Sequence, residues 1–344
     1  MAESFVAPEV TVITGATGWL GRALVDRLLA DPSRPRLRLL AETTAQGRQL
    51  QAIGDVEVVV GDITKPDTAA RLLHGVGAGA DVLHTVGVIH PKATRQFFDI
   101  NVNGTRSVAE AALEHGVRRM VHISSNSAFG TNAQPGDTFR ASEPYHPYLN
   151  YGWSKMEGEL AVLDAVSRGL DATIVRPPWF YGPFQPPRQT TFFRLVRAGR
   201  FPVLGNGEQR RSMVYIGNLV DGVLAAELTP MAKGRGYWVA DACAHTVNEI
   251  VATVGRALRD EGFAVKEPST RLPAIAGRVA ELGDRLVQRL GRYQQQLHVL
   301  GEMNHTIACD ISVTCAELGY QPRVELYEGM RSSIRWCVEQ GLEL

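Results

Sequence analysis

The sequence predicts an α/β fold in which helices cover both faces of a parallel sheet, followed by a smaller second region. Three observations support this prediction. A strand, a glycine-rich turn and a helix open the chain, apolar strand-like runs then alternate with helical patterns, and five prolines crowd the segment 177–187. The boundary between the two regions is therefore expected near residue 180, with later segments returning to the sheet.

The first element pair surrounds the stretch TGATGWLG, residues 14–21. An apolar run precedes it, and leucines at helical spacing follow it. Gly15, Gly18 and Gly21 suit a tight turn, a close approach of the backbone to a ligand, and a helix that lies against the sheet. The free N–H groups and the dipole at that helix start favour a pyrophosphate.

The remaining strands of the first region are expected where apolar runs recur, with ligands at their carboxyl ends. Asp62 in VVVGDIT lies just past one of these runs, and Val86 in DVLHTVG lies at the end of another, where an adenine and its ribose would lie. Asp62 fits the N-cap of a helix equally well. The expected strands are residues 37–41, 56–60, 82–86, 120–123 and 172–175.

Chemistry is predicted where HISSNS follows a strand and YGWSK opens an amphipathic helix. Tyr151 and Lys155 are four residues apart, so a helix places both on one face. A nearby ammonium favours the phenolate of a tyrosine that otherwise titrates near ~10. A serine hydroxyl from the neighbouring strand end would hold the substrate oxygen.

The whole-chain composition excludes several classes of function. The 344 residues contain 36 basic and 36 acidic side chains, so no net field favours nucleic acid as a partner. No apolar run approaches the length of a membrane span, and the first ten residues lack the pattern of a secretory signal, so cytoplasmic residence is expected. The four cysteines have no metal-site spacing, and we expect reduced thiols and no metal.

These motifs, in order and spacing, resemble the extended short-chain dehydrogenase/reductases. The resemblance extends from about residue 9 to the C-terminus and includes the late segment CAELGYQPRVELYEGMRSSIRW. It implies a Rossmann domain over residues 1–180 that binds a dinucleotide, and a mainly substrate-binding region over residues 181–344. The motifs that carry it are TGATGWLG, GDIT, HTVG, NVNGT, HISSNS, YGWSK and IVRPPWFYGP.

The resemblance also implies roles for individual residues. Tyr151 would be the general acid/base, Lys155 its partner and a ligand of the nicotinamide ribose, and Ser125 the donor to the substrate oxygen, with Ser124 as an alternative hydroxyl. Asn101 matches the family's helix asparagine near the active site. The expected cofactor-binding residues are Gly15, Thr17, Gly18, Trp19, Leu20, Gly21, Glu42, Asp62, Ile63, Val86, Tyr151, Lys155 and Pro177, and the expected substrate-binding residues are Ser125, Tyr181 and Arg211.

One departure from related families narrows the reaction. Sugar-nucleotide 4,6-dehydratases resemble this chain but carry an Asp-Glu pair after the hydroxyl residue, where this chain has Asn126 and Ser127. Eliminating water needs an acid and a base beyond the tyrosine. The sequence therefore argues against dehydration.

Two substrate classes remain open. The stretch VYIGNLVDG and the segment that starts at RLPAIAG resemble the 3β-hydroxysteroid dehydrogenase and sterol-carboxylate dehydrogenase branch. GNGEQRRSMVYIGNLV resembles nucleotide-sugar epimerases, in which an arginine at the position of Arg211 clamps a phosphate. However, Trp179 stands where many epimerases have an asparagine. We favour an oxidoreductase acting on a bulky, largely apolar alcohol or ketone, with a non-catalytic dinucleotide-binding regulator as a third reading.

The segment 271–292 is predicted to form an amphipathic helix with arginines beside an apolar stripe. Such a segment rests on a membrane, caps an apolar pocket, packs in the core or forms a homodimer face, and the pattern alone leaves these readings open. The stripe consists of Leu272, Ile275, Val279, Leu282, Leu286 and Leu290.

The choice of dinucleotide depends on Glu42, which follows the second strand. A carboxylate there accepts hydrogen bonds from ribose hydroxyls and repels a 2′-phosphate, so NAD is expected over NADP. Arg22, Arg38 and Arg48 are the groups that would reverse this preference if they reached the same region.

Overall fold

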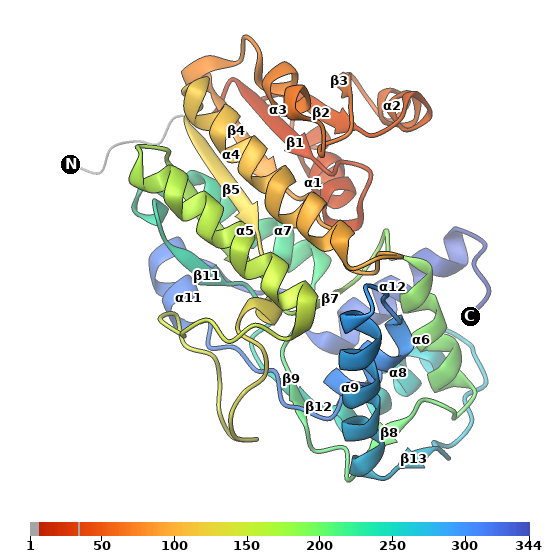
Figure 1. Ribbon diagram of the computed structural model, residues 1–344. Coiled ribbons are helices and arrows are strands. Elements are labelled where there is room, and N and C mark those ends of the chain that lie inside the picture. The colour runs from red at the N-terminus through yellow and green to blue at the C-terminus, as the bar shows by residue number, and fades with distance from the viewer. Residues whose placement is uncertain (1–6, 34) are drawn as a thin grey trace.

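The computed structural model describes residues 7–33 and 35–344, and a seven-stranded sheet lies at its centre (Figure 1). The strand order is β11-β6-β5-β4-β1-β2-β3, and all neighbouring strands are parallel. The doubly wound parallel sheet predicted from the sequence is confirmed. Its strands are β1 (Val10–Thr14), β2 (Arg36–Ala41), β3 (Glu57–Val60), β4 (Ala80–His84), β5 (Arg119–Ile123), β6 (Ala172–Arg176) and β11 (Gly236–Trp238).

The strand limits differ from the expected ones chiefly at β4, which begins at Ala80 and ends at His84. Thr85 and Val86 therefore lie in the loop beyond the strand. The last strand, β11, comes from far along the chain and pairs with β6 at the sheet edge. Three residues are too few to produce a recognisable apolar run, so this strand was not predicted.

Helices cover the two faces of the sheet and form two separate apolar cores. One core packs beneath α1 (Trp19–Leu29), α2 (Thr44–Gln51), α7 (Ile216–Leu228) and α11 (Ser312–Leu318). The other packs beneath α3 (Pro66–Leu73), α4 (Thr105–Glu114) and α5 (Leu149–Ser167). A π-helical segment, η2 (Phe97–Gly104), leads directly into α4. The short 3₁₀ helices are η1 (Gly77–Gly79), η3 (Asn126–Ala128) and η4 (Pro230–Ala232).

A second region lies beyond the carboxyl ends of the strands, in the lower part of Figure 1, and has its own apolar core. That core is built mainly on α6 (Pro187–Arg197), α8 (Val247–Asp260) and α12 (Leu326–Glu339), while α9 (Ala274–Arg289) packs on α10 (Gln295–Glu302). Short strand pairs complete the region. They are β7 (Trp179–Tyr181) with β10 (Met213–Tyr215), β8 (Val203–Leu204) with β13 (Arg271–Leu272), and β9 (Arg210–Arg211) with β12 (His245–Thr246).

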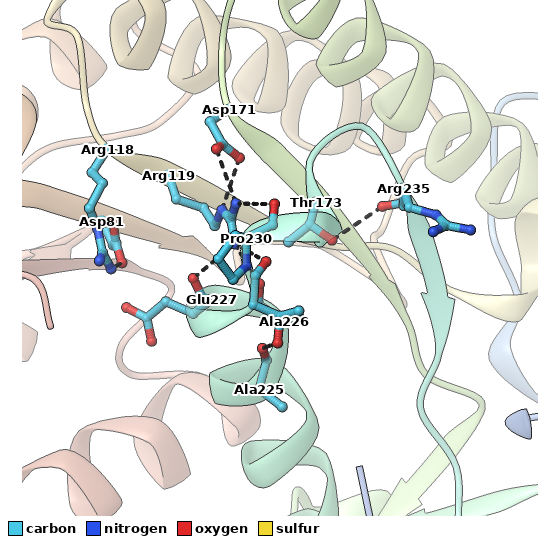
Figure 2. A network of polar contacts seen from close by, with 11 residues as sticks. Asp81, Arg118, Arg119, Asp171, Thr173, Ala225, Ala226, Glu227, Pro230 and Arg235 are labelled. Atoms are coloured by element: carbon cyan, nitrogen blue, oxygen red, sulfur yellow. Dashed lines mark hydrogen bonds and ion pairs between the residues drawn. The ribbon is translucent and has the colours of Figure 1, made fainter. Parts of the chain in front are cut away.

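A polar network joins the amino-terminal end of β5 to the end of α7, at the end of the strands away from the second region (Figure 2). The buried guanidinium of Arg119 donates to both carboxylate oxygens of Asp171, at 2.9 and 3.0 Å. It also donates to the carbonyls of Ala226, Glu227 and Thr229. These are carbonyls that the end of a helix leaves without intrahelical donors, so Arg119 fixes α7 to the sheet.

The Glu227 side chain is buried in the same network, beside the carboxylate of Asp81. Burial, and then the negative charge of Asp81, raise the pKa of the Glu227 carboxyl well above its ordinary value of 4.5. The folded chain therefore keeps this proton at pH values at which the unfolded chain has lost it.

Replacing Glu227 with Gln should remove a pH dependence of stability. The free energy of unfolding of the wild type should fall, relative to Glu227→Gln, as the pH rises from the unfolded value of 4.5 toward the raised pKa of the folded state. Urea denaturation across this pH range measures the difference. Glu114→Gln, at an exposed position of α4, is the control, and its free energy of unfolding should differ from that of the wild type by the same amount at every pH. A difference in the free energy of unfolding between the wild type and Glu227→Gln that does not change with pH would contradict the raised pKa.

Candidate active site

A cavity of about 640 Å³ lies between the carboxyl ends of the strands and the second region. Its wall begins at Gly18, at the start of α1, and continues over the loops that follow β4 and β5. The far wall comes from α6, α8, α10 and the segments that follow α6 and α10, and it is rich in apolar side chains. The apolar members of that wall are Phe192, Leu195, Phe201, Val247, Ile250, Val251, Val299, Met303 and Ile307.

The glycine-rich turn fits the phosphates of a dinucleotide. Gly18 is the N-cap of α1 and provides no side-chain cap, so the first N–H groups of the helix are left for another acceptor. A Cβ atom at Gly21 would lie 2.1 Å from the carbonyl oxygen of Gly15, so only glycine fits there. Gly15 has a φ of +70°, which also favours glycine. Gly18, Trp19, Leu20 and Gly21 line the cavity, while Gly15 and the exposed Thr17 are not part of its wall.

Tyr151 and Lys155 come from the first turns of α5, and both line the cavity. Two close contacts position the helix: a Cβ atom at Gly152 would lie 2.3 Å from the carbonyl oxygen of Ser127, and one at Gly158 would lie 2.9 Å from that of Asn101. The sequence expectation that one helix face presents Tyr151 and Lys155 together agrees with this arrangement.

Burial dominates the electrostatics of the pair. The Lys155 Nζ donates to the carbonyl oxygen of Ile123 at 2.7 Å. Burial raises the pKa of Tyr151 to about 12, and it lowers the pKa of Lys155 to about 8, with Glu159 acting in the opposite sense on Lys155. Tyr151 is therefore a phenol at neutral pH, because the desolvation that raises its pKa outweighs the groups that lower it.

The two serines after β5 have different surroundings. Ser125 lines the cavity with Tyr151 and opposes the rise of the tyrosine pKa, and its hydroxyl accepts from the backbone N–H of Ser127 at 3.2 Å. The buried Ser124 hydroxyl has no partner within the described part of the chain. Asn126 also lines the cavity, and its side-chain nitrogen has no partner there either. The sequence had singled out Asn126 only as a departure from the dehydratases.

Asn101 lies in η2 behind the cavity wall. Its side-chain oxygen accepts from the N–H of Val88 at 2.8 Å, and its amide nitrogen donates to the Val88 carbonyl at 3.0 Å and to Ser154 Oγ at 2.9 Å. All of these bonds fix the loop after β4 to α5. In this structure Asn101 thus ties the loop after β4 to α5 and is not part of the cavity wall.

The expected adenine end lies outside this cavity. Glu42 is exposed just after β2, and Asp62 is half-buried after β3, where its carboxylate accepts from the N–H and hydroxyl of Thr64. Lys65, not Asp62, is the N-cap of α3. Ile63 packs in the core, and Val86 packs against it, whereas Pro177 lines the cavity.

The structure brings Arg211 to the cavity and keeps Tyr181 away from it. Tyr181 is fully buried in the core of the second region, where its hydroxyl donates to Asp241 at 2.8 Å. Arg211 lines the cavity, and its Nη2 donates to the carbonyl oxygen of Glu302 at 2.5 Å. Tyr181 has no free hydroxyl to offer a substrate in this arrangement.

Three further polar groups of the wall come from the second region or the loop after β4. Arg188 forms no ion pair within residues 7–33 and 35–344, and its guanidinium carbon lies 5.9 Å from the centroid of the Trp19 ring. His298 Nδ1 lies 2.8 Å from the buried carboxylate of Asp284, and His90 Nδ1 lies 2.9 Å from the Tyr293 hydroxyl. Sequence analysis missed them because nothing in the local pattern distinguishes an inward arginine or histidine from a solvated one.

The apolar stripe of α9 does not cap the cavity. Ile275, Val279, Leu282 and Leu286 are each at least 60% exposed and are absent from the cavity wall. Polar residues occupy the inner face of the helix, where Asp284 and Gln288 are buried. Among the readings left open by the sequence, a pocket lid and core packing are therefore excluded for this stripe.

Comparisons with known proteins agree with the glycine turn and the sheet. The model of the NAD dependent epimerase/dehydratase family matches residues 11–240. The chain is 42% identical to the uncharacterized protein y4nL of Sinorhizobium fredii, over 97% of this chain and 96% of that protein. It is 29% identical to sterol demethylase protein B of Methylococcus capsulatus, over 96% and 99% of the two chains. The structure of UDP-glucuronic acid 4-epimerase from Bacillus cereus in complex with NAD superposes with a TM-score of 0.75, at 19% identity, covering 97% of this chain and all of that one.

Proposed function

The chain belongs to the NAD dependent epimerase/dehydratase family, as its motifs predicted, and from this premise we propose that it is an NAD-dependent oxidoreductase. Its reaction interconverts a hydroxyl and a ketone on a bulky, largely apolar substrate. The observation that carries the proposal is that Ser125, Tyr151 and Lys155 line one cavity, which starts at the glycine turn and ends in apolar walls.

Ser125, Tyr151 and Lys155 have separate roles in the proposed reaction. NAD, when bound, supplies the hydride acceptor or, in its reduced form, the donor. Ser125 and Tyr151 hold the substrate oxygen, and the Tyr151 hydroxyl moves the proton at that oxygen. Its raised pKa keeps the proton in place at neutral pH, which suits donation to a ketone oxygen. Lys155 is buried beside the end of β5 and supplies the positive charge on the same helix face.

The apolar wall supports the choice of substrate. Phe192, Val251 and Met303 belong to an apolar surface that would remove a ring system or an acyl chain from water. The relatedness to a sterol demethylase protein over nearly the whole chain points in the same direction. Trp179, where many nucleotide-sugar epimerases have an asparagine, lines the same cavity and adds to its apolar surface.

Two arginines favour a second candidate, a nucleotide-sugar epimerase or reductase that acts through a transient 4-keto intermediate. Arg211 is buried and Arg188 half-buried in the cavity wall, and neither has an anionic side chain as an ion-pair partner among the described residues. A guanidinium fork of this kind is suited to a diphosphate. The two candidates therefore differ in what Arg211 contributes to binding.

Tyr151→Phe should abolish turnover and leave cofactor affinity nearly unchanged, because the change removes the proton donor and little binding surface. We expect kcat to fall by at least about 100-fold, the scale of general acid–base catalysis. Steady-state kinetics with a sterol-like secondary alcohol, and NAD titration by fluorescence, measure the two effects. Lys155→Met should reduce both turnover and cofactor affinity.

Tyr148→Phe is the matched control for the tyrosine. Tyr148 precedes α5 by one residue, and its buried hydroxyl has no partner within the described part of the chain. Its loss should leave the rate unchanged. A wild-type rate for Tyr151→Phe would mean that another group moves the proton.

NAD should bind more tightly than NADP, because Glu42 follows β2 and would repel a 2′-phosphate. Arg38 is not available to reverse this preference: it pairs with Glu57 at 2.9 Å and donates to the carbonyls of Leu72 and His74. Titration of both cofactors, repeated with Glu42→Gln, measures the preference. A lower dissociation constant for NADP in the wild type would overturn the assignment.

Arg211→Ala separates the two substrate classes. If the guanidinium clamps a diphosphate, its loss should weaken binding of a UDP-sugar by about 1.5 to 3 kcal/mol, and added salt should weaken the wild type. We expect neither effect for the true substrate. Its affinity should instead grow by about 0.8 kcal/mol for each buried CH₂.

Arg210→Ala is the control for this experiment, since Arg210 is the neighbour of Arg211 on β9 and does not line the cavity. Isothermal titration with UDP-sugars and with a series of sterol-like alcohols measures both classes. Saturable UDP-sugar binding that disappears in Arg211→Ala but survives in Arg210→Ala, with no turnover of any alcohol, would favour the epimerase.

A further inference from the structure

The outer face of α9 carries the largest run of exposed apolar side chains on any one helix of the described chain. Ile275, Val279, Leu282, Leu286 and Leu290 are 66, 62, 61, 60 and 80% exposed, respectively. Their spacing of three or four residues places them on one face of the helix. The stripe is about 22 Å long, from the rise of about 1.5 Å per residue.

The inner face of the same helix explains why this stripe points outward. Gly277 and Ala280 allow α10 and β8 to approach, and the carboxylate of Asp284 accepts from Gln288 Nε2 at 3.0 Å and lies 2.8 Å from His298 Nδ1. The Gln288 oxygen accepts from the N–H of Asn150. Rotating α9 to bury the stripe would break these buried polar contacts, so the exposure of the stripe is built into the packing.

Basic side chains border the stripe. Arg278, Arg285 and Arg289 are exposed, and helical spacing puts them along one edge of it. Arg285 pairs with Glu281, whereas Arg278 and Arg289 have no ion-pair partner among the described residues. The chain as a whole has no net charge, so this is a local excess.

A second segment extends this basic border. Arg292, also exposed, forms a backbone bridge with Ala93, and the N–H of Thr94 donates to the carbonyl of Gly291. These contacts bring the loop that carries exposed Lys92 and Arg95 next to the end of α9. Arg95 pairs with Asp99 at 3.2 Å, and Lys92 has no ion-pair partner in the described residues.

We propose that α9 is a membrane-docking helix that lies flat on a bilayer containing anionic lipid. The apolar stripe would enter the boundary between headgroups and acyl chains, and the arginines and Lys92 would contact lipid phosphates. The segment does not span the bilayer, since no helix of the described chain is long and apolar enough to cross a membrane. The basic side chains beside the stripe favour an anionic bilayer over a neutral apolar partner.

The position of the stripe relative to the cavity gives the docking a consequence. The next helix, α10, packs on α9, and its Val299 is 38% exposed while also lining the cavity. A bilayer under α9 would therefore lie beside one wall of the cavity. The docking itself rests on the surface of α9 and not on the proposed substrate.

Vesicle co-sedimentation of the full chain tests the proposal. The wild type should sediment with phosphatidylcholine–phosphatidylglycerol vesicles, more weakly with phosphatidylcholine alone, and less in high salt. Leu282→Glu/Leu286→Glu should weaken binding at least tenfold. Arg278→Gln/Arg289→Gln should remove most of the preference for the anionic vesicles.

A matched control places the same charges on other exposed apolar positions. Met231→Glu/Val338→Glu changes side chains that are 55 and 53% exposed and lie outside α9, and this variant should bind vesicles like the wild type. Circular dichroism and thermal unfolding confirm that each variant is folded. Because no turnover is measured, failure here leaves the proposed reaction untouched.

Two results would overturn membrane docking. One is a wild type that does not sediment with either vesicle, or that binds as well after Leu282→Glu/Leu286→Glu. The other is sedimentation velocity that shows a wild-type dimer, a monomer for Leu282→Glu/Leu286→Glu, and no vesicle binding by either. That second result would assign the stripe to a second copy of the chain.

Discussion

The helix that carries Tyr151 and Lys155 lies so close to its neighbours that two of its positions have room only for a hydrogen atom. Side chains at Gly152 and Gly158 would collide with the carbonyl oxygens of Ser127 and Asn101. These two contacts fix the position and rotation of α5 against η3 and η2. Tyr151 thereby faces the same cavity as Ser125, and the Lys155 ammonium reaches the last carbonyl of β5.

Several buried charges of the described chain form ion pairs, whereas the two arginines of the cavity wall do not. Glu159 lies one turn beyond Lys155 and accepts from Arg176 and from the Tyr145 hydroxyl at 2.7 Å each. Breaking such a buried pair is costly, because it leaves one charge without compensation. Arg188 and Arg211 have no such anionic partner in the described residues. The unpaired charges suit a nucleotide sugar, whereas the apolar wall beside them suits a largely apolar alcohol or ketone.

The α9 helix reverses the usual distribution of side chains, with polar groups inside and apolar groups outside. The buried side is satisfied: Asp284 lies against His298 and Gln288, and Gln288 reaches the backbone of Asn150. Burying these polar groups without their partners would be unfavourable, and that fixes which face meets solvent. The same packing of α9 therefore holds His298 at the cavity and leaves the apolar stripe exposed.

The sequence by itself determined the features that local chemistry specifies. Glycine spacing after the first strand, apolar runs between helical patterns and the four-residue spacing of Tyr151 and Lys155 predicted the parallel sheet, the glycine turn and the shared helix face. These predictions succeeded because each depends on neighbours in the chain. The same reasoning placed Ser125 after a strand, although it could not separate Ser125 from Ser124.

Tertiary structure decided what depends on contacts between distant segments. β11 joins the sheet from residue 236, Arg188 and His298 reach the cavity from the second region, and Tyr181 turns into a core instead. The pKa of Tyr151 rises because burial, which no local pattern encodes, outweighs the charges around it. The periodicity of α9 revealed a stripe but not its direction, since a helix with one apolar and one polar face packs by whichever face finds partners, and here those partners are Asn150 and His298.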